Sequence, residues 1–314
     1  MSGFTSQFWA STIDGLTVGS IYALVALGYT LVYGVLQLIN FAHSEIFMIG
    51  TFAVLGFFGI LGLNAPATGF VLVLVILGAL IVGAVASGGT ALALQFIAYR
   101  PLRRRGASRL AALITAIGAS LFLREIIGIT QGTQRVTVKT RVLEKTQLFT
   151  IGSAQVRADK VLVIVAAVVM MILLDRFVNG TRLGRGIRAT SQDAESATLM
   201  GVNIDRVVST TFLVGGAMAG VAAALYLIFY ENTSYDVGFV LGIKAFTAAV
   251  LGGIGNLRGA LIGGVAIGLI ENYGSSFTFT GAQWRDVIVF GILVLVLLFR
   301  PTGLLRETGG SVRA

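Results

Sequence analysis

The sequence predicts an all-α polytopic membrane protein with about 8–10 transmembrane helices, some short or broken, and a small extracellular β-hairpin. Hydrophobic residues make up 56% of the 314 residues and charged residues 12%, and the mean hydropathy is +0.90. The apolar runs are long enough to cross a hydrocarbon core of about 30 Å. Basic residues gather at the ends of these runs, as the positive-inside rule expects. We therefore attribute the net charge of +9 to the topology of a membrane protein, and we expect no nucleic-acid partner.

The apolar runs follow one another along the whole chain, and we expect one domain over residues 1–314. Arg100 to Arg109 hold five arginines in ten residues, with Pro101 as a helix breaker, and this loop is assigned to the cytoplasm. Counting arginines on this basis gives about nine spans, with the N-terminus outside and the C-terminus in the cytoplasm. The expected spans are residues 15–36, a run that ends near 61, 69–99, 110–130, 161–174, 207–230, two short spans that meet near 256–258, and 286–299.

Residues 131–160 are polar and are expected to form an extracellular loop. Val136, Val138 and Val142 alternate with polar residues, which is typical of a strand. The stretches on either side of Gly152 and Ser153 are expected to give the second arm of a hairpin.

The segment from 176 to 206, here called the polar segment, is expected to be an ordered cytoplasmic loop. Thr190 or Ser191 can cap a helix N-terminus, with Asp193 in the first turn of that helix. Gly201 supplies a stop signal.

Small and adaptable side chains recur within the polar segment. Ala194, Ala197 and Met200 stand three residues apart and are expected on one face that fits a groove. From spacing alone, a plain connection that folds back on the lipid headgroups is an equal alternative.

Glycines recur at spacings suited to close helix packing. The alternative is that glycine is simply frequent in membrane helices. The candidate packing residues are Gly15, Gly19, Gly216, Gly220, Gly259, Gly263, Gly264 and Gly268.

Polar residues gather at one place in the first half of the chain, at Asn40, His43, Ser44 and Glu45. Glu45 is the only formal charge between Asp14 and Arg100. Polar residues inside a membrane are functional candidates by default. One hypothesis is a break in the helix that lines a path across the membrane. The alternative is the cytoplasmic turn between the first two spans.

No catalytic site is expected, and the chain is not expected to be an enzyme. A Gly-Lys dipeptide is absent, so the chain has no P-loop with which to hydrolyse ATP. The residue arrangements of intramembrane proteases are absent as well. With no cysteine and one histidine, we expect no metal site and no cofactor of its own.

Three motifs occur in order along the chain: residues 15–52, the polar segment, and residues 243–264. Together they resemble the permeases of ABC importers for branched-chain amino acids, the LivH type. In the polar segment the matching residues include Arg188, Thr190, Asp193, Ala197, Met200 and Gly201. Ser44 departs from the pattern, because the family often has glycine there.

The resemblance implies a membrane-spanning permease subunit that moves branched-chain or other neutral amino acids into the cell. It implies a second permease of similar type, in a heterodimer or homodimer, and an extracytoplasmic substrate-binding protein. It also implies two cytoplasmic subunits that bind ATP and Mg, with a short helix of the polar segment in a cleft of one of them. The location would be the inner (plasma) membrane of a bacterium or archaeon.

Two kinds of alternative stay open. Permeases for urea or short amides share the three motifs, so the substrate is open within the family. A secondary transporter or an uncoupled channel would need no coupling loop, and a secondary transporter usually has several acids or histidines within its spans. Broken helices surround the central site of many transporters, so Gly252 and Gly253 join Asn40, His43, Ser44 and Glu45 as candidates for the translocation path.

Overall fold

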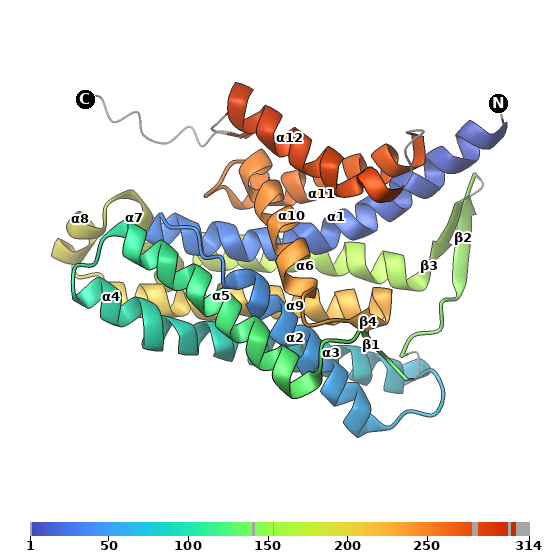
Figure 1. Cartoon of the computed structure of the whole chain (residues 1–314), viewed down its shortest axis with the longest axis horizontal. Coiled ribbons are helices and arrows are strands. Elements are labelled where there is room, and N and C mark those ends of the chain that lie inside the picture. Colours follow the sequence, from blue (N-terminus) through green and yellow to red (C-terminus); the bar gives the residue numbers. More distant parts are fainter. Residues whose placement is uncertain (1, 140–141, 153, 278–281, 301–302, 306–314) are drawn as a thin grey trace.

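The computed structural model describes residues 2–139, 142–152, 154–277, 282–300 and 303–305, and most of its long helices lie lengthwise in one bundle (Figure 1). The helices are α1 (Ser2–Leu36), α2 (His43–Leu61), α3 (Gly69–Leu94), η1 (Gln95–Tyr99), α4 (Arg100–Arg104), α5 (Arg109–Gln131), α6 (Ala158–Gly180), α7 (Arg182–Gln192), α8 (Ala194–Leu199), α9 (Ile204–Tyr230), α10 (Val237–Gly252), α11 (Leu257–Phe277), η2 (Ala282–Trp284) and α12 (Arg285–Phe299). The strands are β1 (Val136–Thr137), β2 (Gln147–Ile151), β3 (Ala154–Arg157) and β4 (Asn232–Thr233).

Among the described residues, six helices are long and apolar enough to cross a membrane: α1, α2, α3 with its extension to Arg104, α5, α6 and α9. The shorter apolar α10, together with α11 and α12, completes the bundle. This confirms the predicted polytopic helical fold with some short spans. The predicted meeting of two short helices is confirmed by the turn between α10 and α11, where Gly253 and Gly255 both have φ of +101°.

The core of the bundle lies around α1. In the most apolar 18-residue stretch of α1, 94% of the residues are buried, whereas the value is 17% in both α3 and α5. Helix α1 packs mainly against α11, α9, α10 and α6, and α3 packs along α9. Helix α5 therefore presents most of its apolar surface to whatever surrounds the subunit.

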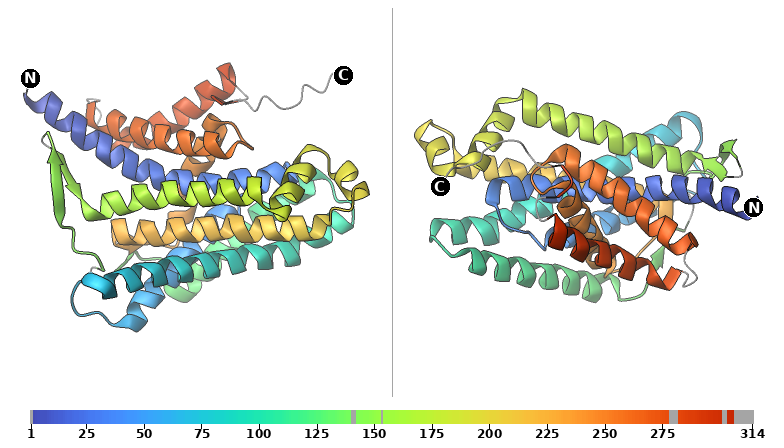
Figure 2. Two further views of the ribbon diagram at one scale, coloured as in Figure 1. Left: turned by 180° about the vertical axis from the view of Figure 1, so that it is seen from behind. Right: turned by 90° about the horizontal axis from the view of Figure 1, so that it is seen from above.

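The two ends of the bundle differ in composition (Figures 1 and 2). The arginine end carries α4, α7, α8 and the start of α9, and the strand end carries the strands and the start of α1. At the arginine end, Asp205 accepts hydrogen bonds from Arg100 at 3.1 Å, from Arg104 at 3.0 Å, and from Arg103. These contacts hold α4 against the start of α9.

The prediction that Pro101 breaks the helix is wrong. The helix runs from α3 through η1 into α4, because Pro101 lies in the first turn of α4, where the missing N–H is tolerated. The preceding π-helix has already changed the hydrogen-bond spacing, and the Arg100 N–H bonds to the Gln95 carbonyl, five residues back. The helix ends at Arg104, and Gly106, with φ of +62°, turns the chain just after it.

The predicted hairpin is present, but both of its arms follow residue 146. Strands β2 and β3 pair antiparallel on either side of Gly152, whose φ is +61°. Ser153, the other predicted turn residue, lies outside the described residues.

The prediction of a strand running from Val136 to Val142 is wrong beyond its first two residues. Strand β1 ends at Thr137 and pairs with β4 from the far half of the chain, not with the hairpin. Val142 is instead buried beside Ala67, whose N–H donates to its carbonyl at 3.1 Å. Burial of that side chain outweighs a local alternation pattern. Residues 140 and 141 lie outside the described residues.

Candidate functional site

The polar segment forms two short helices outside the main bundle. Thr181 caps α7, since its Oγ1 accepts a 2.9 Å hydrogen bond from the Gly184 N–H. The predicted cap at Thr190 or Ser191 is therefore wrong, because this earlier cap starts the helix sooner and both residues lie within α7. Arg188, also in α7, donates to Asn179 Oδ1 at 2.6 Å.

Asp193 separates α7 from α8 and caps the second helix. Its carboxylate accepts hydrogen bonds from the backbone N–H groups of Glu195 at 2.9 Å and Ser196 at 3.3 Å. The Ser196 hydroxyl, followed by these N–H groups, lowers the pKa of Asp193 from its usual value, so the cap stays charged at neutral pH. Gly201 has φ of +84° and lies at the predicted stop.

The predicted common face of Ala194, Ala197 and Met200 is wrong. Ala197 is 4% exposed and packs toward its own chain, whereas Met200 is 87% and Leu199 83% exposed. Residues spaced by three drift around a 3.6-residue helix, and the Val202 N–H bonds to the Ala197 carbonyl as the chain turns back. The outward apolar pair is Leu199 and Met200, and Leu199 was not part of the predicted face.

The polar residues of the first half lie at a break between α1 and α2. Helix α1 ends at Leu36, Gln37 has φ of +51°, and α2 begins at His43. The break therefore covers 37–42. It includes Asn40 of the predicted stretch 40–45, whereas His43, Ser44 and Glu45 are helical. The chain folds back into the bundle after the break, and the His43 ring packs directly against Gly28, two turns before the end of α1. A side chain at Gly28 would overlap with that ring.

Asn40, His43, Ser44 and Glu45 are all buried. The Ser44 hydroxyl donates to the Phe41 carbonyl at 2.7 Å. Glu45 Oε1 has two weak hydroxyl contacts at 3.4 Å, from Ser44 and Ser120. Glu45 Oε2 has no hydrogen-bond partner among the described residues. A buried carboxyl so weakly satisfied is costly, which marks Glu45 as a functional candidate.

The π-helix η1 faces the same break. The Tyr99 hydroxyl donates to Asn40 Oδ1 at 2.8 Å. Gln95 lies one turn earlier on that face and is fully buried, and neither of its amide atoms has a partner in the described part of the chain. π-Helical turns occur frequently at functional sites. Gln95 was missed from the sequence, where it looks like the polar end of an apolar run.

Aromatic rings lie next to the break. The ring of Tyr29 lies 4.7 Å from that of His43 and 6.2 Å from that of Phe246. Tyr29, Asn40 and Phe246 also border a cavity of about 10 Å³. This volume has room for about one water molecule. The region around the break is therefore closed in this conformation.

Gly252 and Gly253 lie elsewhere, in the tight connection between α10 and α11. A side chain on Gly252 would overlap with the Gly259 carbonyl, and Gly253 packs against Gly303. The structure therefore places these two glycines in a backbone contact at the end of α10.

The candidate packing glycines lie at helix crossings. A Cβ on Gly264 would overlap with Ala23, and one on Gly220 would overlap with the Gly83 carbonyl. The same holds for the remaining members of the set, namely Gly15, Gly19, Gly216, Gly259, Gly263 and Gly268, each of which faces another helix at close range. Glycine at these points allows the backbones to approach.

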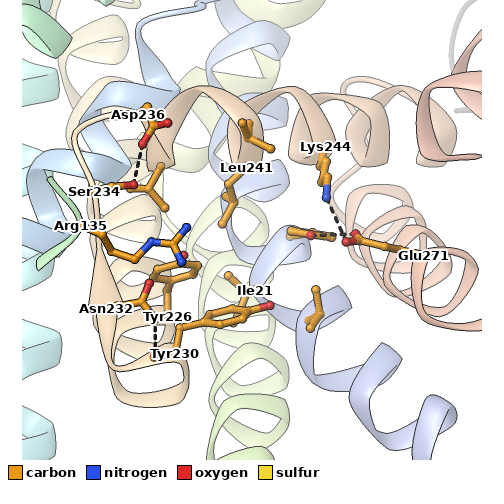
Figure 3. Close-up of a pocket in the computed structure, with 14 residues that line it drawn as sticks. Ile21, Arg135, Tyr226, Tyr230, Asn232, Ser234, Asp236, Leu241, Lys244 and Glu271 are labelled. Carbon is orange, nitrogen blue, oxygen red and sulfur yellow. Dashed lines mark hydrogen bonds and ion pairs between the residues drawn. The ribbon is translucent and has the colours of Figure 1, made fainter. Parts of the chain in front are cut away.

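A larger cavity of about 270 Å³ lies toward the strand end, among α1, α9, α10 and α11 (Figure 3). On its inner side, Lys244 Nζ lies 2.9 Å from Glu271 Oε1, and the Tyr22 hydroxyl donates to Glu271 Oε2 at 2.8 Å. Lys244 also pairs with Asp286 of α12 at 2.7 Å. Arg135 extends into the cavity from the opposite side.

Sequence reasoning missed this cavity. Lys244 and Glu271 carry the signal that could have found them, since each is a charge within a long apolar run. Arg135 and Asp236 carry none, because both stand in polar connections.

Known proteins similar to this chain match it along nearly its whole length. The family described as the permease component of the branched-chain amino acid transport system matches residues 11–297. The permease protein BraD of Pseudomonas aeruginosa, described as part of a high-affinity branched-chain amino acid transport system, is 39% identical over 93% of this chain and 94% of its own. The corresponding LivH protein of Escherichia coli K12 is 40% identical over 95% of both chains. A probable LivH permease of Methanocaldococcus jannaschii is 28% identical over 93% of this chain and 91% of its own. With its apolar helix bundle, its polar segment and a match along nearly all of its length, the chain belongs to the family of branched-chain amino acid ABC transporter permeases.

Proposed function

We propose that this chain is the membrane-spanning subunit of an importer that moves branched-chain or other neutral amino acids into the cell. ATP hydrolysis on partner subunits would supply the energy, while this chain catalyses no reaction and binds no cofactor. Family membership supports the transport role, and the names of the 39–40% identical relatives support the substrate class.

The observation that carries the coupling to ATP is α8 and its flanks. Leu199 and Met200 are almost fully exposed on a capped, ordered segment that projects from the arginine end. Exposed apolar side chains on an ordered helix end are typical of an interaction site. We assign them to a groove on the ATP-binding subunit, with Arg188, Thr190, Asp193 and Gly201 shaping the segment and Ala197 fixing it to the bundle.

The arginine end is proposed to face the cytoplasm. Arg100, Arg103 and Arg104 lie there with the arginines of α7, as the positive-inside rule expects for short loops. This orientation puts the N-terminus of α1 and the four strands outside the cell, where a substrate-binding protein would deliver its ligand.

A second permease of similar type is proposed as partner in the membrane. Helices α3 and α5 bury only 17% of their most apolar stretches within this chain, so a large apolar surface remains for a partner or for lipid. Both a heterodimer and a homodimer would bring two breaks of the α1–α2 kind to one assembly.

The translocation path is proposed to pass the break at Asn40, His43, Ser44 and Glu45. Asn40 lies in the break and the other three lie in the first turn of α2 that follows it, and transporters commonly bind their cargo at such interruptions. The rings of Tyr29 and Phe246 would close the path in the present conformation.

The test is uptake into proteoliposomes that contain this chain with its partner permease, ATP-binding subunits and binding protein. We expect uptake of labelled leucine that requires enclosed ATP and survives collapse of the proton and sodium gradients. ATP-driven uptake of urea or acetamide without leucine would overturn the substrate class. Uptake by this chain alone, driven by an ion gradient, would instead indicate a secondary transporter.

A further inference from the structure

We infer that the 270 Å³ cavity at the strand end binds one amino acid in its zwitterionic form, with Arg135 at the carboxylate and Asp236 at the ammonium group. The inference rests on the proposed function and names where its cargo first binds in the membrane subunit. It concerns a site separate from the break between α1 and α2.

The charges around the cavity form two sets, which we call the inner pair and the outer pair; the two residues of the outer pair do not contact each other. The inner pair, Lys244 and Glu271, is buried and satisfied, since each partner has a further contact, to Asp286 and to Tyr22. The outer pair, Arg135 and Asp236, is exposed at the mouth (Figure 3). Among the described residues, Arg135 has no ion pair, and the Asp236 carboxylate accepts one hydrogen bond, from the Ser234 hydroxyl at 2.6 Å. The outer pair is therefore available for a ligand that carries both signs of charge.

The small sheet at the strand end brings the outer pair together. Strand β1 pairs antiparallel with β4, with Val136 opposite Thr233. The next position in that register places Arg135 opposite Ser234, whose hydroxyl binds Asp236 at the start of α10. Two residues about one hundred positions apart in sequence thus border one cavity. The pairing of the short strands β1 and β4 brings them there.

The space between the pairs fits a short apolar side chain. Ile21 and Leu241 lie between the outer and inner charges (Figure 3), and Val18 and Val240 are further apolar residues that line the cavity. A volume of about 270 Å³ is slightly below the range of about 300–1,000 Å³ found for drug-sized ligands, so it suits a single small metabolite. A bound amino acid would place its charged groups at the mouth and its side chain against Ile21 and Leu241.

The first test uses the absence of native cysteine. Val240→Cys puts a thiol on the cavity wall at a side chain that is 43% exposed, and Thr133→Cys puts one on the exposed loop before β1, which does not border the cavity. In the assembled transporter, we expect leucine to slow maleimide labelling of Val240→Cys at least about fivefold and to leave Thr133→Cys unchanged. Leucine uptake with no protection at Val240→Cys would overturn this site and leave the proposed function standing. Protection without ATP-driven uptake would support the site and remove the proposed function.

The second test separates the two charged groups of the ligand. Arg135→Gln should weaken leucine protection about tenfold, and should abolish the preference for leucine over isopentylamine, which lacks the carboxylate. Asp236→Asn should abolish the preference over 4-methylpentanoate, which lacks the ammonium group. Lys139→Gln removes a charge from the same loop without touching the cavity and is the matched control. Unchanged preferences in both variants would contradict the assignment.

Discussion

The Tyr99 hydroxyl donates a 2.8 Å hydrogen bond to Asn40 Oδ1 and so ties the π-helical end of α3 to the break between α1 and α2. Both residues are buried, and Asn40 Nδ2 has no further partner within the described residues. Asn40 Oδ1 also accepts a 3.2 Å hydrogen bond from the Ala42 N–H, so the Tyr99 contact links α3 to a side chain that already shapes the break locally.

We expect Tyr99→Phe to lower the free energy of unfolding by about 1 kcal/mol, because a buried hydrogen bond is lost while the ring stays in place. Thermal unfolding of the purified subunit in nanodiscs measures this change. Tyr33→Phe removes a hydroxyl from another tyrosine, in α1, that is not part of this hydrogen bond, and is the control. A loss as large for Tyr33→Phe as for Tyr99→Phe would mean that the contact to Asn40 has no special weight.

Cysteine substitutions at Asn40, His43 and Glu45 test whether the break lines the path. All three positions are buried in this closed conformation, so labelling by a membrane-impermeant thiol reagent should be slow at rest. We expect labelling to rise at least about fivefold when the ATP-binding subunits are trapped with nucleotide, because the path must open there during the cycle. Labelling that is constant from the arginine side alone in all states would show an ordinary turn.

We expect the stability of the subunit to be sensitive to loss of the buried ion pair between Lys244 and Glu271. Glu271→Gln leaves the Lys244 ammonium with Asp286 as its remaining charged partner and should destabilise the subunit by about 3 kcal/mol, as breaking a buried pair typically does. The double change Lys244→Met with Glu271→Leu should cost less than either single change, because no charge is then left buried. A double-mutant cycle on melting temperature measures the coupling, and additive effects would contradict it.

Close packing of α11 on α1 predicts a large effect of Gly264→Leu. The new side chain would meet the Ala23 backbone, so we expect a loss of about 3 kcal/mol in stability. Gly118→Leu in α5 adds the same side chain where the structure leaves open space around the Cβ, and its effect should stay below about 1 kcal/mol. Equal melting temperatures for the two variants would indicate that the glycines are not needed for packing.

Leu199→Asp and Met200→Asp should separate docking from folding. Both side chains are exposed, so stability should change by less than about 0.5 kcal/mol, while co-purification of the ATP-binding subunit and ATP-driven uptake should be lost. Ala197→Glu should instead destabilise the polar segment itself, since Ala197 is buried. Thr198→Asp, at the exposed position between Ala197 and Leu199, is the control. Normal co-purification of both apolar-to-acidic variants would place the docking surface elsewhere.

Sequence alone determined the helical membrane fold, the approximate spans and the position of the polar segment. These features depend on local composition: a long apolar run must form a helix in lipid because each backbone polar group needs a partner within the same segment. The three motifs were likewise contiguous and could be read without a structure. The clustered polar residues at 40–45 were found for the same reason.

Tertiary structure decided the details that depend on distant contacts. The cap at Thr181 displaced the expected start at Thr190 or Ser191, and the fold of the polar segment turned Ala197 inward and Leu199 outward. The strand expected at 136–142 was cut short because its partner β4, some hundred residues later, is two residues long, and because Val142 is buried instead. Pairings between residues far apart depend on how helices pack, and helix packing leaves no local pattern in the sequence. For that reason Arg135 and Asp236 became recognisable as one site only when the fold placed them at the same cavity.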